Sequence, residues 1–102
     1  MLRTAAQRKK LCTNCPVARV ADLLGDSVSL IIIRDLLRAP KRYGELAESL
    51  EGVSTRTLTL KLSRLKTCGF VRHTAASYTL TAKGRALAPI VDSMRQYGEK
   101  YL

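Results

Sequence analysis

The strongest hydrophobic pattern in the chain lies in residues 54–70, which read STRTLTLKLSRLKTCGF. Leu58, Leu62 and Leu65 recur at the spacing that places side chains on one face of a helix. Ser54 precedes the pattern and is suited to cap the first turn with its hydroxyl. The opposite face offers arginine, threonine, serine and one leucine, and the stretch contains no acidic residue. The pattern therefore predicts an amphipathic helix whose outer face suits a polyanion, and we expect it to be a DNA-recognition helix.

Shorter apolar patterns predict three helices before this one, at Val17–Leu24, Val28–Leu37 and Tyr43–Leu50. The second of these is apolar on most sides and is expected to be the central buried helix. The third is joined to the basic helix by a short turn that contains Gly52. Two short helices joined in this way, with the second basic on its outer face, are typical of a helix-turn-helix.

A hairpin and a further helix are predicted after the basic helix. Gly69 is placed to end that helix, since glycine readily adopts a positive φ. Phe70–His73 and Ser77–Leu80 are β-prone segments separated by a three-residue turn. Thr81 is suited to cap a C-terminal helix, which Pro89 is expected to kink or restart. Together these elements predict a mainly helical fold with a small β-hairpin, the winged helix-turn-helix.

The C-terminal helix carries an apolar stripe that needs a surface to pack on. The stripe consists of Leu87, Ile90, Val91, Met94 and Tyr97. Because a small domain often gains stability by dimerising, we expect this stripe to contact a second copy of the chain. The alternative is that the helix folds back onto the core of its own chain.

Length and charge narrow the range of functions. A chain of 102 residues forms one domain, which we divide into a basic arm (1–14), a winged helix-turn-helix (15–80) and a dimerisation helix (81–102). The net charge of +10 indicates a phosphate-rich or acidic partner, without choosing among DNA, RNA and a membrane surface. The basic arm is either a solvated tail or a contact to the DNA backbone or a second subunit.

Several classes of protein are not expected. No apolar run is long enough to cross a membrane, and no secretory leader is visible. Three cysteines are an odd number, so we expect reduced thiols and a cytoplasmic location instead of a disulfide framework. The chain shows no paired carboxylates, no nucleophile–base pair and no phosphate-binding glycine loop. We therefore expect neither an enzyme nor a cofactor.

Cys12 and Cys15 form a C-x-x-C pair directly before Pro16, which suits the first position of a helix. Cys15 is thus expected at a helix N-terminus, where the dipole favours a thiolate. Three interpretations stay open: a sensor in which Cys15 is the nucleophile and Cys12 resolves it, a metal site, or inert thiols. The pair supplies two of the four ligands that zinc prefers, so we predict no metal site. Cys68, near the end of the basic helix, is expected to be buried.

Several short motifs, in this order, resemble the HxlR-type winged helix-turn-helix regulators, which are relatives of the MarR group. They are Cys15–Val17, Arg34–Leu37, Arg42–Leu46, Gly52–Thr59, Gly69–Val71, Tyr78–Thr81 and Gly84–Pro89. The resemblance implies a homodimeric transcription factor, usually a repressor, whose recognition helices enter the major groove of a pseudo-palindromic operator in double-stranded DNA. Some members of that family sense electrophiles or oxidants through the cysteine that matches Cys15, so the resemblance also favours a sensing role for Cys15.

On this interpretation, Arg56 is the leading candidate for a base contact, because guanidinium bonds guanine bidentately. Leu60 stands where the family often has glutamine, so it can make only apolar contact. The other candidate DNA contacts are Thr55, Thr57, Thr59, Lys61, Ser63 and Arg64 on the basic helix, Arg42 and Tyr43 before it, and Arg72 and His73 in the hairpin. The alternative function is a winged-helix module that binds RNA or another protein without reading a DNA sequence.

Overall fold

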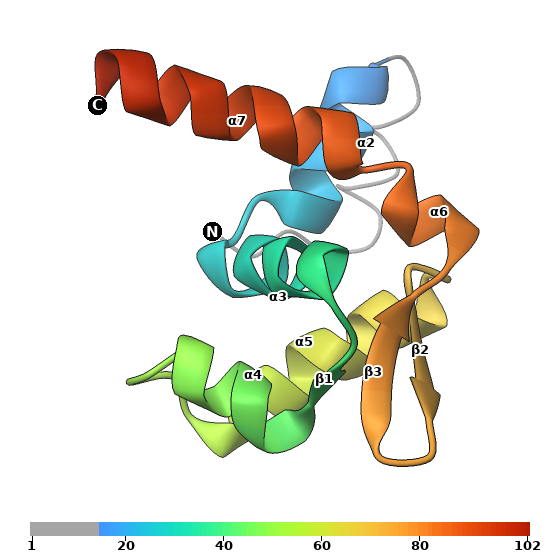
Figure 1. Ribbon diagram of the computed structural model, residues 1–102. Helices are drawn as coiled ribbons and strands as arrows, with labels where there is room; N and C mark the ends of the chain where they lie inside the picture. Colours follow the sequence, from blue (N-terminus) through green and yellow to red (C-terminus); the bar gives the residue numbers. More distant parts are fainter. Residues whose placement is uncertain (1–14) are drawn as a thin grey trace.

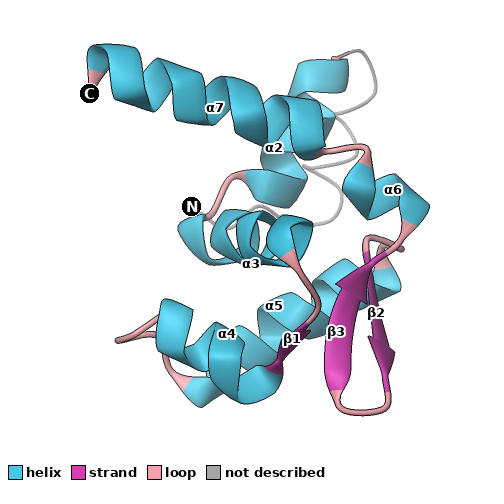
Figure 2. Ribbon diagram, viewed as in Figure 1, coloured by secondary structure: helices cyan, strands magenta, loops and turns pink. Residues whose placement is uncertain are grey.

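The structure is a computed structural model that describes residues 15–102. In chain order the elements are α2 (Pro16–Leu24), α3 (Ser27–Arg38), β1 (Lys41–Arg42), α4 (Tyr43–Ser49), α5 (Thr55–Thr67), β2 (Val71–Thr74), β3 (Ser77–Leu80), α6 (Ala82–Arg85) and α7 (Ala88–Tyr101). Figure 2 shows this mainly helical fold with its small sheet, which is the winged helix-turn-helix predicted from the sequence. The predicted basic arm, residues 1–14, and Cys12 within it lie outside the described residues.

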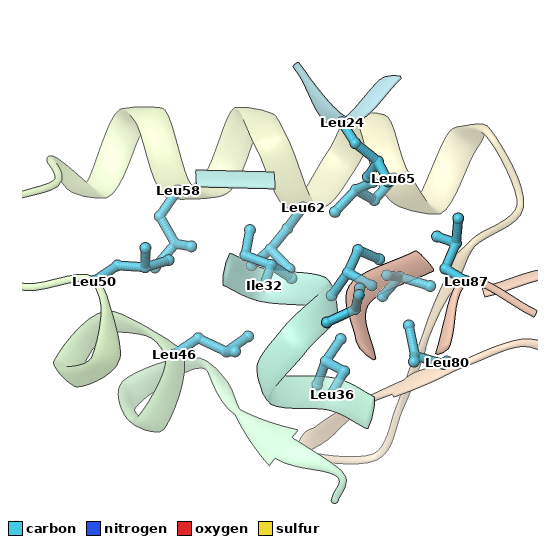
Figure 3. Close-up of a cluster of buried hydrophobic side chains, with 13 residues drawn as sticks. Leu24, Ile32, Leu36, Leu46, Leu50, Leu58, Leu62, Leu65, Leu80 and Leu87 are labelled. Atoms are coloured by element: carbon cyan, nitrogen blue, oxygen red, sulfur yellow. The ribbon is translucent and has the colours of Figure 1, made fainter. Parts of the chain in front are cut away.

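The helix α3 lies at the centre of the hydrophobic core, as its apolar sequence predicts. Ile32 and Ile33 have no exposed surface. Leu58, Leu62 and Leu65 of α5 are almost completely buried, and Figure 3 shows them on the side of α5 that faces Ile32. Burying each such side chain contributes about 1.5–3 kcal/mol relative to leaving it exposed. The apolar face of α5 is therefore held on the core, which leaves its polar face outward.

Local signals set the ends of α5 and α6. The backbone N–H of Thr57 donates to Ser54 Oγ at 3.1 Å, and that of Gly84 donates to Thr81 Oγ1 at 3.2 Å. These bonds satisfy N–H groups that have no partner within the first turn of a helix. Beyond the end of α5, Gly69 has a φ of 85°, a conformation that glycine adopts without strain. The predicted caps and the predicted end of the recognition helix are thus confirmed.

The sheet contains one strand more than the predicted hairpin. Its order is β1-β3-β2, with both pairs antiparallel. The two residues of β1 pair with Tyr78 and Ser77 of β3. A strand this short has no pattern of its own, and its pairing with a segment far along the chain arises only on folding. The hairpin turn is also shorter than predicted, because Thr74 and Ser77 are paired and leave a turn of two residues, in which Ala75 has a φ of 50°.

The predicted C-terminal helix is divided into α6 and α7. Pro89 lies in the first turn of α7, where its missing N–H costs no hydrogen bond. Leu87 and Val91 are each 7% exposed and belong to the core of the chain itself. Their prediction as dimer contacts is therefore corrected, because they hold α7 on its own domain. The large hydrophobic side chains that α7 leaves exposed are Ile90, Met94, Tyr97 and Tyr101.

Two exposed faces lie at opposite ends of the molecule. One is the polar face of α5, and the other is the apolar face formed by α2 and α7. Figure 1 shows α4, α5 and the β2–β3 hairpin at one end, and α2 with α7 at the other. The central helix α3 separates them. Within residues 15–102, no helix combines the length and the hydropathy that a membrane span requires.

Candidate nucleic-acid interface and cysteine site

The helix α5 presents a continuous polar face to solvent. Its exposed residues are Thr55, Arg56, Thr59, Leu60, Ser63, Lys66 and Thr67. Because α5 contains no acidic residue, no carboxylate of the helix itself neutralises this face. Lys66 is missing from the predicted contacts, although continuing the spacing of Arg56 and Ser63 by one more turn would have identified it.

Tyr43 fixes the start of α5 against α4. Its hydroxyl donates to the carbonyl of Thr55 at 3.2 Å and lies 3.2 Å from the hydroxyl of Thr59, which is then the donor of that second bond. Ser54 Oγ in turn donates to Thr57 Oγ1 at 3.0 Å within the cap of α5. The hydroxyls of Tyr43 and Thr57 thus each form a hydrogen bond with another group of the protein. Both residues position the start of the helix, in contrast to the direct DNA contacts predicted for them.

Arg64 and Lys61 turn away from the polar face toward α2 and the link after it. Arg64 NH2 donates to the carbonyl of Asp22 at 2.9 Å and lies 3.4 Å from its Oδ2. Lys61 Nζ lies 3.6 Å from Oδ2 of Asp26, the N-cap of α3. Partial burial opposes ionisation of Asp26, but hydrogen bonds from Ser29 and the charge of Lys61 outweigh it and lower the pKa of the carboxyl. This geometry does not match the phosphate contacts predicted for Lys61 and Arg64.

Two exposed arginines lie on the small sheet, Arg42 in β1 and Arg72 in β2. The backbone N–H of Arg42 donates to Glu45 Oε1 at 2.9 Å at the start of α4, while the Arg42 side chain is exposed to solvent. Arg72 is exposed on β2. Beside it, the ring of His73 stacks on Tyr78 of β3, with centroids 4.0 Å apart and an angle of 3° between the planes. Arg42 and Arg72 are therefore free to reach a ligand, whereas the His73 ring is held by its stacking partner.

The Cys15 and Cys68 thiols are both exposed. Cys15 lies at the N-terminus of a helix, whereas Cys68 lies at the C-terminus of one. Cys15 is the N-cap of α2, and its Sγ accepts from the N–H of Ala18 at 3.4 Å. Cys68 follows the last turn of α5 as its C-cap, and Lys83 Nζ donates to the Cys68 carbonyl at 2.9 Å. The prediction that Cys68 is buried is wrong, because its side chain is exposed after the last turn of α5. In residues 15–102, no cluster of histidine, cysteine and carboxylate side chains could hold a metal ion.

An open apolar groove of about 540 Å³ runs between α2 and α7. Its lining includes Pro16, the residue that follows Cys15. The residues that line it are Pro16, Val17, Val20, Ala21, Leu24, Gly25, Leu30, Ile90 and Met94. A second hollow of about 520 Å³ continues along α7 from Pro89 to Tyr97. Apart from Leu60, the exposed large hydrophobic side chains in the described part of the chain all belong to α2, to α7 or to the C-terminal residue.

Comparison with known proteins identifies similar sequences and similar folds. A family model described as HxlR-like helix-turn-helix matches residues 23–102. An HTH-type transcriptional regulator of Synechocystis sp. is 36% identical over 95 residues, which cover 86% of this chain and 70% of that protein. Quinone-bound YodB from Bacillus subtilis is similar in structure, with a TM-score of 0.78 and 31% identity over 85% of this chain and 100% of that chain. The redox regulator HypR in its reduced form also has a TM-score of 0.78, with 31% identity over 84% of this chain and 92% of that one.

Proposed function

The chain belongs to the HxlR-like helix-turn-helix family of transcriptional regulators, and we propose that it binds a pseudo-palindromic DNA operator as a homodimer. The observation that carries this proposal is the outer face of α5, which is exposed, basic and free of carboxylates. Binding over a promoter would block transcription, so we propose repression as the outcome.

The reading end of the interface is the first half of α5. Arg56 is exposed and makes no ion pair within the described residues, so its guanidinium is free to bond a guanine in the major groove. The hydroxyl of Tyr43 holds this end of α5 in place through its hydrogen bonds with Thr55 and Thr59. Phosphate contacts come from the exposed Ser63 and Lys66 of α5, and from Arg42 and Arg72 of the sheet.

The dimer interface is proposed to be the apolar face formed by α2 and α7. Val17 is 76% exposed and Met94 is 49% exposed, and together with Ile90 they line one groove. Leaving so much apolar surface in water is unfavourable, and a second copy would cover it. This face lies at the end of the molecule opposite α5, so pairing through it leaves both recognition helices free (Figure 1). The proposed interface retains three residues of the predicted apolar stripe, Ile90, Met94 and Tyr97.

Cys15 is proposed to sense electrophiles. An electrophile with a conjugated carbonyl would form a bond from its β carbon to Sγ and take up the thiol proton. The adduct would stand at the N-terminus of α2 beside the apolar groove, where it would alter the packing of α2. Because Arg64 bonds Asp22 of α2, a shift of α2 would act directly on α5. The relatives support this proposal, since the solved structures include a redox regulator and a quinone-bound form.

The operator is tested by selecting bound fragments from random DNA and footprinting the best of them. We expect a protected palindrome of roughly 20 base pairs whose half-sites are about one helical turn apart. Binding that ignores sequence, or that prefers RNA, would instead support a winged-helix module that does not read DNA.

The dimer is tested by sedimentation of Met94→Glu, which places a charge in the groove. The matched control is Gln96→Glu, which adds the same charge to α7 outside the groove. We expect Met94→Glu to be monomeric and to bind the operator weakly, while the control stays dimeric. A dimeric Met94→Glu would contradict the proposed interface.

The sensor is tested by mass-spectrometric labelling with a limiting amount of a quinone. Cys68 serves as an internal control, because it is also exposed but lies at a helix C-terminus. We expect Cys15 to be modified first, because its Sγ lies at the open N-terminus of α2 and accepts from the N–H of Ala18, whereas Cys68 follows the C-terminus of α5. Equal labelling of Cys15 and Cys68 would contradict a sensing role.

A further inference from the structure

Leu60 is an apolar side chain in the middle of a polar and basic face. It is 59% exposed, with Arg56 one turn before it and Ser63 one turn after it. The other exposed large hydrophobic side chains in residues 15–102 lie on α2, on α7 or at the C-terminus, at the far end of the molecule (Figure 1). Leu60 therefore forms no contiguous apolar patch of the kind that a protein partner covers. Its surroundings fit a ligand that is anionic overall and carries a small apolar group.

Resting on the proposed function, we propose that Leu60 is a specificity-determining residue that recognises the C5-methyl group of thymine in the major groove. Thymine is the base whose major-groove edge carries a methyl group, and apolar side chains contact it. Leucine has neither a donor nor an acceptor, so it cannot bond the polar edge of any base. Its contribution to specificity is then a preference for thymine over cytosine at the position it touches.

The spacing along α5 sets where this thymine lies. Leu60 follows Arg56 by four residues, which is about 6 Å along the helix axis. That length corresponds to about two base-pair steps of duplex DNA. Each half-site is therefore expected to contain a guanine bonded by Arg56 and a thymine within about two or three base pairs of it.

The test replaces the thymines of the selected operator by deoxyuridine, one symmetric pair at a time. Deoxyuridine pairs as thymine does and lacks only the methyl group. We expect one pair of replacements to weaken binding of the full chain by about fourfold per half-site, or about fifteenfold for the dimer, as loss of one buried methyl group implies. The variant Leu60→Ala should bind the normal operator more weakly and should lose this sensitivity to deoxyuridine.

Ser63→Ala is the matched control, since Ser63 lies on the same exposed face one turn away. It should retain the full deoxyuridine effect of the unmodified protein. If Leu60→Ala keeps the same deoxyuridine effect at every position, the Leu60 proposal is overturned, while the selected palindrome still supports the proposed function. If the unmodified protein selects no sequence at all, the proposed function fails and the Leu60 proposal fails with it.

Discussion

Replacing Arg64 and Arg56 separately by methionine distinguishes an arginine that stabilises the fold from one that binds DNA. Both lie on α5, and sequence reasoning assigns both to the DNA interface. In the structure, Arg64 NH2 donates to the Asp22 carbonyl at 2.9 Å, whereas Arg56 is exposed and has no partner in the described residues. Methionine preserves most of the apolar stem in each case and removes the guanidinium. The two variants therefore differ mainly in which contact they lose.

The size of the Arg64 effect follows from its two contacts. A hydrogen bond from a charged donor contributes about 1.5–3 kcal/mol when buried. The Arg64 side chain is 35% exposed, and a solvated ion pair such as that with Asp22 adds about 0–1 kcal/mol. Discounting for solvent, we expect Arg64→Met to lower the free energy of unfolding by about 1–2 kcal/mol. Each kcal/mol corresponds to a Tm lower by about 4–8 °C in a domain of this size.

Thermal melts at one protein concentration and gel-shift titrations at one salt concentration measure the two effects. Fixed protein concentration matters because the Tm of a dimer depends on it. We expect Arg56→Met to melt as the unmodified chain does and to lose roughly tenfold or more in operator affinity, the typical loss for a bidentate guanine contact. Arg64→Met should have a lower Tm than the unmodified chain and should bind the operator with nearly the same affinity. An Arg64→Met variant of unchanged Tm that binds as weakly as Arg56→Met would refute the inward placement of Arg64.

Three further predictions follow from single contacts. Gly84→Ala should destabilise the chain by about 1–3 kcal/mol in urea titrations, because an added Cβ would meet the carbonyl of Phe70; an unchanged midpoint would contradict that packing. The pKa of Asp26 is lowered on folding, so its carboxylate stabilises the fold above its ordinary pKa of 3.8 and this stability is lost as the pH falls through the folded value. Asp26→Asn should therefore lose less stability on acidification than the unmodified chain, as denaturant titrations at a series of pH values would show. Arg42→Ala should reduce the slope of log affinity against log salt by about one per half-site without relaxing the sequence preference, and an unchanged slope would exclude a phosphate contact by Arg42.

The helix α5 and its neighbours can be predicted from the amino-acid sequence alone, because the signals for them are local. The spacing of Leu58, Leu62 and Leu65 selects the buried face of α5, and Ser54 and Gly69 mark its ends whatever the rest of the chain does. Pro89 likewise restarts the last helix through its own geometry. Arg56 and Leu60 fall on the outward face for the same reason, so the proposed reading end of the interface follows from the sequence pattern.

The roles of the residues at the borders of that face depend on how the elements pack together. Helical spacing places Lys61 and Arg64 between the buried and exposed sides of α5, and their long side chains reach carboxylates of segments that the sequence does not bring near them. In the same way, β1 exists only because it pairs with β3, and Val91 is buried only because α7 packs on its own domain. A periodic pattern fixes the direction of a side chain relative to its helix. The partner of that side chain depends on how the helices pack. Because of this packing, Arg56 is exposed and available to DNA, whereas Arg64 holds α5 to α2.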